Sequence, residues 1–409
     1  MKQRILFIAP SSYPPNNPEA YVNAKQIKIL ADAGYEIDLV CGRVTNAYPE
    51  DDDNALFAKV HKIVYIPMSR KRNLKNLWHH IKVLVQTGYI YKGINWVYPA
   101  LKECKKLLSQ HKYSYIFTKD YPSEVLGAYL AKRYKIKWVA TWNDPYMWIK
   151  YPEPYGQGIN APISHWRKKL IRDIGKYSFK NLFPSNRLRD YMLQYMTGMD
   201  PESCVIIPHA LIDMPVNTSP LQPDGTLKMI YAGSLGKERD PATLLKGISV
   251  FHKKHPEIAL RIDLLTIFDR SDAHQFEDLL ERLALKDIVF RCQPVKYRES
   301  LKIIAQYDVC LIIEAPCNEG IFLPSKVIDY FQCLKPIWAL SPQRGVLADM
   351  YTDKLIDYFS DVTDQDAICA TIENIAADYS NGRLHIHKEY PQPYTASHIL
   401  QNFRTEVLV

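Results

Sequence analysis

The stretch that decides the fold runs from Glu319 to Pro336 and reads EGIFLPSKVIDYFQCLKP. Pro324 and Ser325 are typical of a helix start. Apolar residues then recur at helical spacing and predict one buried face. Lys335 and Pro336 end this helix before a short apolar run that is typical of a strand. The stretch therefore predicts a helix that buries one face and leads directly into a strand.

Lys326 lies in the first turn of this predicted helix, where its charge faces the positive end of the helix dipole. A phosphate bound at this end would remove the conflict, because free backbone N–H groups, the Ser325 hydroxyl and the Lys326 ammonium would converge on it. Asp329 lies one turn further along the same face, where it can accept hydrogen bonds from the vicinal hydroxyls of a ribose or a sugar.

Length and composition indicate two domains. The chain has 409 residues, of which 47% are apolar, and this suits two domains of roughly 200 residues with a core each. No apolar run reaches the roughly 18 residues of a membrane span. The short run from Ile5 to Ala9 stops at Pro10 and predicts a first strand rather than a signal peptide. We therefore expect a cytoplasmic protein.

The cysteine and acidic patterns predict no metal site. The eight cysteines are scattered without any C-x-x-C, and several lie inside apolar runs, so neither disulfides nor structural zinc are expected. The acidic run Asp51-Asp52-Asp53 has no strand before it and predicts a solvated loop instead of a metal motif.

Charge is distributed unevenly along the chain. From Met1 to Val205 there are 31 Lys and Arg against 17 Asp and Glu, a net charge of +14, whereas the remainder has 21 against 27, a net charge of −6. Such asymmetry predicts two domains with different partners, the basic one facing something anionic. Nucleic acid and an anionic membrane surface are both candidates.

Two predicted helices of the basic half carry an apolar stripe with lysines on its flanks. The stripes consist of Leu74, Leu77, Trp78, Ile81, Leu84 and Val85 in the first helix, and Val97, Leu101, Cys104 and Leu108 in the second. A basic, Trp-bearing stripe suits a lipid interface. Packing of the stripe against a sheet explains each helix equally well. The confinement of the charge excess to this half favours the membrane.

The first half opens with a strand, a helix and a second strand, which is the start of a doubly wound sheet. Its first turn lacks G-x-G-x-x-G, so a dinucleotide is not expected there. Asn16, Asn17 and Glu19 at the helix entry are explained by capping and turn formation, or by contact with a sugar or an acceptor. Further on, Asn143 and Asp144 follow the strand Lys137–Thr141, and the carboxyl ends of parallel strands are where such sheets bind ligands. A turn-forming Asx-Pro pair explains them without function.

The second half opens with the strand Leu227–Ala232 and a turn that begins at Gly233-Ser234 and ends at Arg239. Glycine lets the backbone approach a ligand closely. Arg239 provides a rigid fork of donors that fits a diphosphate. The turn therefore predicts a second contribution to a phosphate site.

These stretches resemble the donor site of the retaining glycosyltransferases of family 4. Pro-Ser-Lys, an acid and an aromatic residue three and four positions after the lysine, and Lys-Pro before an apolar strand are similar to the donor-site helix of that family. The resemblance implies that Lys326 and Arg239 bind the diphosphate and that Asp329 binds the ribose. It also implies that Glu319 contacts the donor sugar. Glu319 lies ten residues before Asp329, whereas in the commonest pattern of the family the first acid lies eight residues before the second. The remaining donor contacts that it implies come from Gly233, Ser234, Pro324, Ser325, Asn143 and Asp144.

The fold implied is the GT-B arrangement, an α/β architecture of two Rossmann-like doubly wound parallel-sheet domains that face each other across a cleft. We expect an acceptor domain over residues 1–213, a donor domain over residues 226–392 and a C-terminal helix over residues 393–409 that crosses back. The function implied is retaining transfer of a sugar from a nucleotide-sugar, UDP- or GDP-linked, to a hydroxyl of a glycan or lipid-linked acceptor in surface polysaccharide biosynthesis. Neither a metal nor a cofactor is expected, and the site of action would be the inner face of the cell membrane.

Two other functions remain open at this stage. A nucleotide-sugar epimerase or hydrolase can share the layout, and an acid positioned to take a sugar proton would distinguish it. A nucleic-acid-binding protein is favoured by the basic first half, and its affinity would fall steeply with salt. The acidic second half and the clustered phosphate features argue against nucleic acid as a partner.

Overall fold

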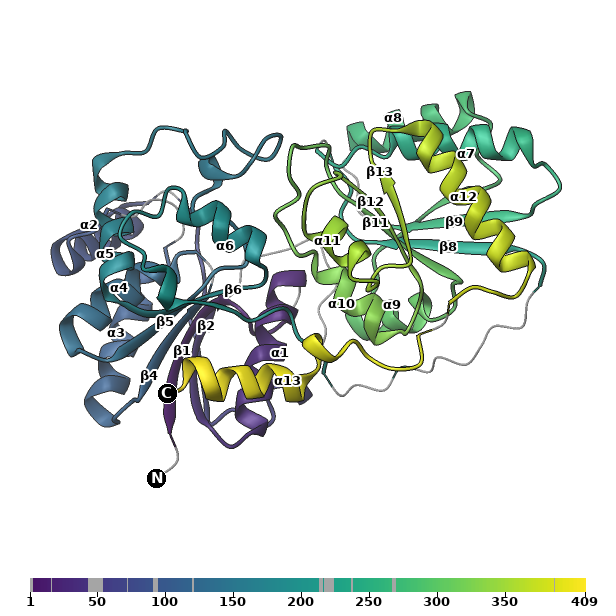
Figure 1. Cartoon of the computed structure of the whole chain (residues 1–409). Helices are drawn as coiled ribbons and strands as arrows, with labels where there is room; N and C mark the ends of the chain where they lie inside the picture. Colours follow the sequence, from purple (N-terminus) through teal and green to yellow (C-terminus); the bar gives the residue numbers. More distant parts are fainter. Residues whose placement is uncertain are drawn as a thin grey trace. The chain divides into compact units, whose positions relative to one another are not determined.

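The computed structural model describes residues 3–15, 17–42, 54–71, 73–90, 95–119, 121–212, 216, 224–236, 238–266, 270–385 and 387–409. The chain forms two compact units (Figure 1). The first comprises Met1–Tyr151, Gln157–Ile212 and Thr395–Val409, and the second comprises Pro152–Gly156 and Asp213–Tyr394. Asn16, the acidic run at residues 51–53 and most of residues 214–225, between the two expected domains, lie outside the described residues.

The first unit is built on a parallel sheet with the strand order β3-β2-β1-β4-β5-β6-β7. The strands are β1 (Arg4–Ser11), β2 (Glu36–Gly42), β3 (Lys62–Tyr65), β4 (Tyr115–Lys119), β5 (Lys137–Thr141), β6 (Ser178–Phe183) and β7 (Cys204–Ile206). The central strands are buried apolar runs, as expected of parallel strands covered on both faces. The strand order reverses between β1 and β4, which makes this the point where such sheets bind ligands.

The first unit also contains helices. They are α1 (Pro18–Asp32), α2 (Leu74–Thr87), α3 (Val97–Gln110), α4 (Ser123–Tyr134), α5 (His165–Tyr177), α6 (Asn186–Leu193) and, from the C-terminus, α13 (Ala396–Asn402). Asn17 caps α1, because its side chain accepts a hydrogen bond of 2.8 Å from the backbone N–H of Ala20. The capping explanation of Asn17 is therefore the one that the structure shows.

The C-terminal segment packs in the first unit. After α13 the chain makes a π-helical turn, Phe403–Val407, and the ring of Phe403 lies 6.1 Å from that of Phe117 on β4. The Tyr115 hydroxyl, also on β4, donates a 2.8 Å hydrogen bond to the carbonyl of Val409. The last residues thus complete the core of the first unit.

The second unit contains a parallel sheet with the strand order β10-β9-β8-β11-β12-β13. Its strands are β8 (Leu227–Ala232), β9 (Leu260–Leu265), β10 (Val289–Cys292), β11 (Val309–Ile313), β12 (Ile337–Ser341) and β13 (Tyr358–Asp361). Its helices are α7 (Ala242–Lys254), α8 (Arg270–Arg282), α9 (Tyr297–Ile304), α10 (Ser325–Gln332), α11 (Val346–Thr352) and α12 (Gln365–Ser380).

The order of this second sheet reverses between β8 and β11, so the loops that follow these two strands lie at its switch point. These loops contain the glycine turn after β8 and the Glu319 loop that leads into α10. The helix expected between Glu319 and Pro336 is α10, and the strand expected after it is β12. The expected α/β class, with two parallel-sheet domains, is confirmed (Figure 1).

Candidate active site

The start of α10 presents free backbone donors. Pro324 is the N-cap residue, and no side chain caps the first turn of the helix. Ser325 and Lys326 are the first two residues of α10, while Val327 and Ile328 are buried beneath them. The positive end of the helix dipole and the Lys326 charge therefore lie together, as the sequence predicts.

Lys326 is held against the strand β8. Its Nζ donates a hydrogen bond of 2.7 Å to the hydroxyl of Tyr231 and lies 3.9 Å from the centroid of that ring. A Cβ atom at Gly233 would lie 2.3 Å from this Nζ, so the glycine leaves the space that the ammonium occupies. The Tyr231 hydroxyl in turn donates a 2.8 Å hydrogen bond to the carbonyl of Ser234. Gly233 and Ser234 thus form one wall of the Lys326 site.

The electrostatics around Lys326 favour a bound anion. Burial lowers the pKa of Lys326 well below its usual value, and repulsion from the Arg239 guanidinium lowers it further. The carboxylates of Glu314 and Asp329 act in the opposite direction. Two cations that repel each other in a partly buried site would both be stabilised by a bound diphosphate.

Glu314 is a residue of this site that sequence reasoning missed. It directly follows β11, it is 5% exposed, and it accepts a short hydrogen bond from the Ser341 hydroxyl at the end of β12. A Cβ atom at Gly320 would lie 2.8 Å from its Oε2. Burial raises the pKa of Glu314, whereas Ser341 and the charges of Arg239 and Lys326 lower it. The sequence signal that could have identified Glu314 is an acidic residue directly after an otherwise apolar strand.

Arg239 contacts a residue from far away in the sequence. Its Nε donates a 3.1 Å hydrogen bond to the hydroxyl of Tyr155, and its guanidinium carbon lies 5.5 Å from the centroid of that ring. The ring of Tyr155 also meets Phe322 edge-on at 5.4 Å. Tyr155 belongs to the short segment Pro152–Gly156 that packs in the second unit. No local pattern in the sequence predicts this contact.

Asp329 and Glu319 differ in their surroundings. The Asp329 carboxylate accepts a 2.5 Å hydrogen bond from the hydroxyl of Tyr297, the first residue of α9. Tyr297 directly follows the turn 293–296, so its hydroxyl links the start of α9 to Asp329, the predicted ribose acid. Glu319 lies in the loop between β11 and α10, where its carbonyl oxygen is 3.3 Å from the Cys317 sulfur.

Asn143 and Asp144 lie in the first unit, directly after β5 and Trp142. The hydroxyl of Tyr151 donates a hydrogen bond to Asp144. Burial raises the pKa of Tyr151, and the charge of Asp144 raises it further. Among the predicted site residues, the structure therefore brings together Lys326, Arg239, Gly233, Ser234, Pro324, Ser325 and Asp329, while Asn143 and Asp144 form a separate group in the first unit.

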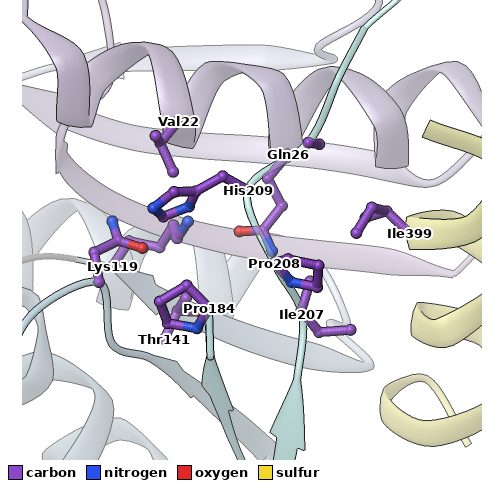
Figure 2. A pocket seen from close by; sticks show the side chains of 11 residues that line it. Val22, Gln26, Lys119, Thr141, Pro184, Ile207, Pro208, His209 and Ile399 are labelled. Atoms are coloured by element: carbon purple, nitrogen blue, oxygen red, sulfur yellow. The ribbon is translucent and has the colours of Figure 1, made fainter. Parts of the chain in front are cut away.

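A small pocket lined by both polar and apolar residues lies at the carboxyl edge of the first sheet (Figure 2). Asn143, Lys119 at the end of β4, Thr141 at the end of β5 and His209 after β7 line it, together with Gln26 of α1. The side-chain oxygens of Gln26 and Thr141 are buried and have no hydrogen-bond partner among the described residues. A polar ligand group or an ordered water would satisfy them.

The sequence of the first unit identifies the family. Residues 24–211 match the sequence model of Glycosyltransferase Family 4. This part of the chain belongs to Glycosyltransferase Family 4. The match covers the half opposite to the one that carries the donor-site motifs, so it confirms independently the family that those motifs predict. No curated protein matches the chain in sequence.

Solved structures are similar to the chain over nearly its whole length. A glycosyltransferase from Rickettsia africae ESF-5 has 12% identity and a TM-score of 0.65, and the match covers 98% of this chain and 94% of that one. HepE from Anabaena, solved with UDP and glucose, has 13% identity and a TM-score of 0.65, with 98% of each chain covered. Sucrose-phosphate synthase from Thermosynechococcus elongatus has 15% identity and a TM-score of 0.63, with 100% and 96% covered. These likenesses show the GT-B fold, and the family match supports a glycosyltransferase.

Proposed function

We propose that the protein is a retaining glycosyltransferase that moves a sugar from a nucleotide-sugar donor to a hydroxyl of a glycan or lipid-linked acceptor. One observation carries this proposal: Lys326 and Arg239 act electrostatically on each other beside the uncapped start of α10. Both lie in loops or helix starts at the switch point of the second sheet, where nucleotides bind in such folds.

The arrangement suits departure of a nucleoside diphosphate. When the bond between the anomeric carbon and the β-phosphate oxygen breaks, negative charge grows on that oxygen. In this proposal, Lys326, Arg239 and the first N–H groups of α10 stabilise that charge. Hydrogen bonds to the hydroxyls of Tyr231 and Tyr155 hold the Lys326 and Arg239 side chains in place. The acceptor hydroxyl forms the new bond on the same face, and its proton passes to the leaving phosphate. We propose no metal and no cofactor for this step, because the two cations supply the charge that a divalent ion would supply.

A UDP-sugar is the donor that we favour. HepE was solved with UDP-glucose, and a similar structure from E. coli, named for trehalose-6-phosphate, was solved with UDP-2-fluoro glucose. A thermal-shift screen with UDP, GDP, ADP and dTDP tests the choice, since a ligand at 100 times its Kd adds about 2.7 kcal/mol to the free energy of unfolding. UDP should give the largest shift, and a shift with none of the four would contradict a nucleotide-sugar donor.

The surface of the first unit, which is the expected acceptor domain, supports binding to a membrane. Five apolar side chains of α2 are exposed at helical spacing, namely Leu74, Leu77, Trp78, Ile81 and Val85. In α3, by contrast, Val97, Leu101 and Cys104 are buried, so packing explains its stripe. Lys169 of the basic helix α5 lies 3.4 Å from the carbonyl of Gly88, the residue that ends α2. An exposed apolar stripe beside a basic helix supports binding to an anionic lipid interface.

A pair of neighbouring substitutions tests this membrane surface. Val85→Glu places a charge within the exposed stripe, and Gln86→Glu places the same charge beside it on an exposed polar position of the same helix. In vesicle flotation, wild-type protein and Gln86→Glu should float with anionic vesicles and stay below with neutral ones, whereas Val85→Glu should not float. Equal flotation of both variants would contradict a role for the stripe.

Within the described residues, no helix is long and apolar enough to cross a bilayer.

The polysaccharide role is supported by one similar structure. The lipopolysaccharide outer core galactosyltransferase WaaB matches the chain at 11% identity and a TM-score of 0.61.

Incubation of the protein with UDP-sugars and no acceptor distinguishes sugar transfer from epimerase or hydrolase activity. A new sugar epimer or rapid release of free sugar would favour an epimerase or hydrolase. Transfer that requires an added lipid-linked glycan would support the proposal.

A further inference from the structure

Three possible metal ligands converge in the second unit, outside the donor site. Nδ1 of His385 lies 2.9 Å from Oδ1 of Asp357, and Nε2 of His387 lies 3.1 Å from Oδ2 of the same carboxylate. The two imidazole rings are 4.5 Å apart, and one ligand atom from each of the three residues lies within 4.8 Å of the others. Among the described residues, no other group of three His, Cys, Asp or Glu residues brings one ligand atom from each within 4.8 Å of the others.

The cluster lies at the edge of the sheet away from the donor site. Asp357 directly precedes β13, and its Oδ2 also accepts a 2.9 Å hydrogen bond from the backbone N–H of Ile337, the first residue of β12. Gly233 and Glu314 follow the strands β8 and β11 at their carboxyl ends. Because these strands are parallel, the cluster is at the amino edge and the donor residues are at the carboxyl edge.

We propose that Asp357, His385 and His387 bind a divalent transition-metal ion, with Zn²⁺ as the expected one. Two imidazole nitrogens and one carboxylate oxygen are ligands that Zn²⁺ accepts readily. His385 is 65% exposed in its side chain, whereas His387 and Asp357 are 12% and 10% exposed. Solvent therefore reaches one side of the cluster and can complete the coordination with water.

Binding requires a defined tautomer of each histidine. The nitrogens that face the carboxylate, Nδ1 of His385 and Nε2 of His387, must lose their protons so that their lone pairs point to the metal. Without a metal, the same nitrogens donate N–H hydrogen bonds to the carboxylate. The ion thus replaces two hydrogen bonds with two nitrogen–metal bonds and one oxygen–metal bond.

The role of such an ion would be structural. His385 and His387 lie in the segment after α12, which leads to the residues that return to the first unit at Thr395. An ion shared with Asp357 would fasten this segment to the start of β12 and β13. This proposal does not depend on the glycosyltransferase assignment, and removal of the ion should leave the donor site intact.

The site is tested with tag-free protein that has been freed of metal by a chelator and dialysed. Calorimetric titration with Zn²⁺ and the visible absorption of bound Co²⁺ measure metal binding. We expect one equivalent of Zn²⁺ to bind and to raise the melting temperature, with no such effect of Mg²⁺. His385→Ala and His387→Ala should each weaken binding by at least about tenfold.

His255→Ala is the matched control, because His255 also lies beside carboxylates, at 3.3 Å from Glu373 and 3.5 Å from Glu257. This variant should bind Zn²⁺ like the wild type. Absence of one-to-one binding to the wild type, or binding that survives both substitutions in the cluster, would overturn the proposal. If His387→Ala does not fold, the exposed position of His385 keeps the test decisive.

Discussion

Replacement of Lys326 by methionine should change activity and stability in opposite directions. Methionine keeps the length of the side chain and its packing over the Tyr231 ring but removes the charge. The Tyr231 hydroxyl still donates to the carbonyl of Ser234, so the substitution leaves that group hydrogen-bonded. The variant therefore isolates the contribution of the ammonium group.

The expected loss of activity follows from the position of the charge. Removal of one pre-oriented donor to a developing anion typically costs about 10²–10³ in rate, or about 2.7–4 kcal/mol in the transition state. UDP affinity should fall as well, because the ammonium is a ligand of the diphosphate in the ground state. Isothermal titration with UDP and a transfer assay with UDP-sugars measure the two effects.

The expected gain in stability follows from the pKa. Burial, and then repulsion from Arg239, lower the pKa of Lys326 well below 10.5, so the unfolded chain binds this proton more tightly than the folded one. Between the lowered value and 10.5 the free energy of unfolding of the wild type must then rise with pH, and Lys326→Met should remove this rise. Each tenfold difference in proton affinity between the two states corresponds to about 1.4 kcal/mol. Each kcal/mol corresponds to about 2–4 °C in the melting temperature of a domain of this size.

Lys253→Met is the control, since Lys253 is an exposed lysine of α7 in the same unit. It should change neither UDP affinity nor the pH dependence of stability. The reasoning is refuted if Lys326→Met binds UDP and transfers sugar like the wild type. A lower melting temperature than the wild type near neutral pH would contradict the electrostatic account of the unliganded site.

Three further outcomes are expected. Gly233→Ala places a Cβ 2.3 Å from the Lys326 ammonium, so UDP affinity should fall about tenfold, or about 1.4 kcal/mol, in a titration of folded protein. Tyr297→Phe removes the hydrogen bond to Asp329, so KM for the donor should rise about tenfold with kcat little changed, and equal KM values would show that this contact does not position the acid. Burial raises the pKa of Glu124 from 4.5 to about 8, so the folded state holds this proton more tightly and the free energy of unfolding must fall as pH rises between these values. Glu124→Gln should flatten that fall in urea melts recorded across the window.

Local sequence patterns predicted the order of elements and one part of the site. Apolar periodicity and end signals are properties of neighbouring residues, and they predicted the strand Leu227–Ala232 and the helix α10 where the structure has them. The glycine turn and the conflict between Lys326 and the helix dipole were visible for the same reason. The match over residues 24–211 confirmed the family that these features resemble.

Tertiary structure alone decided which distant residues complete the site. The contact between Tyr155 and Arg239 joins positions 84 residues apart, and the hydrogen bond from Tyr297 to Asp329 joins positions 32 apart. Glu314 became part of the site because the switch point of the sheet places the end of β11 beside β8. No local pattern encodes such pairs, since they depend on the order in which strands assemble.

The two apolar stripes show the same difference between what the sequence determines and what the folded structure decides. The sequence predicts α2 and α3 alike as amphipathic helices with basic flanks, yet α3 buries its stripe and α2 exposes most of its own. The sequence determines that a helix has an apolar face, because that follows from spacing along the chain. Whether the face is covered depends on which other elements pack against it, and only the folded chain decides that.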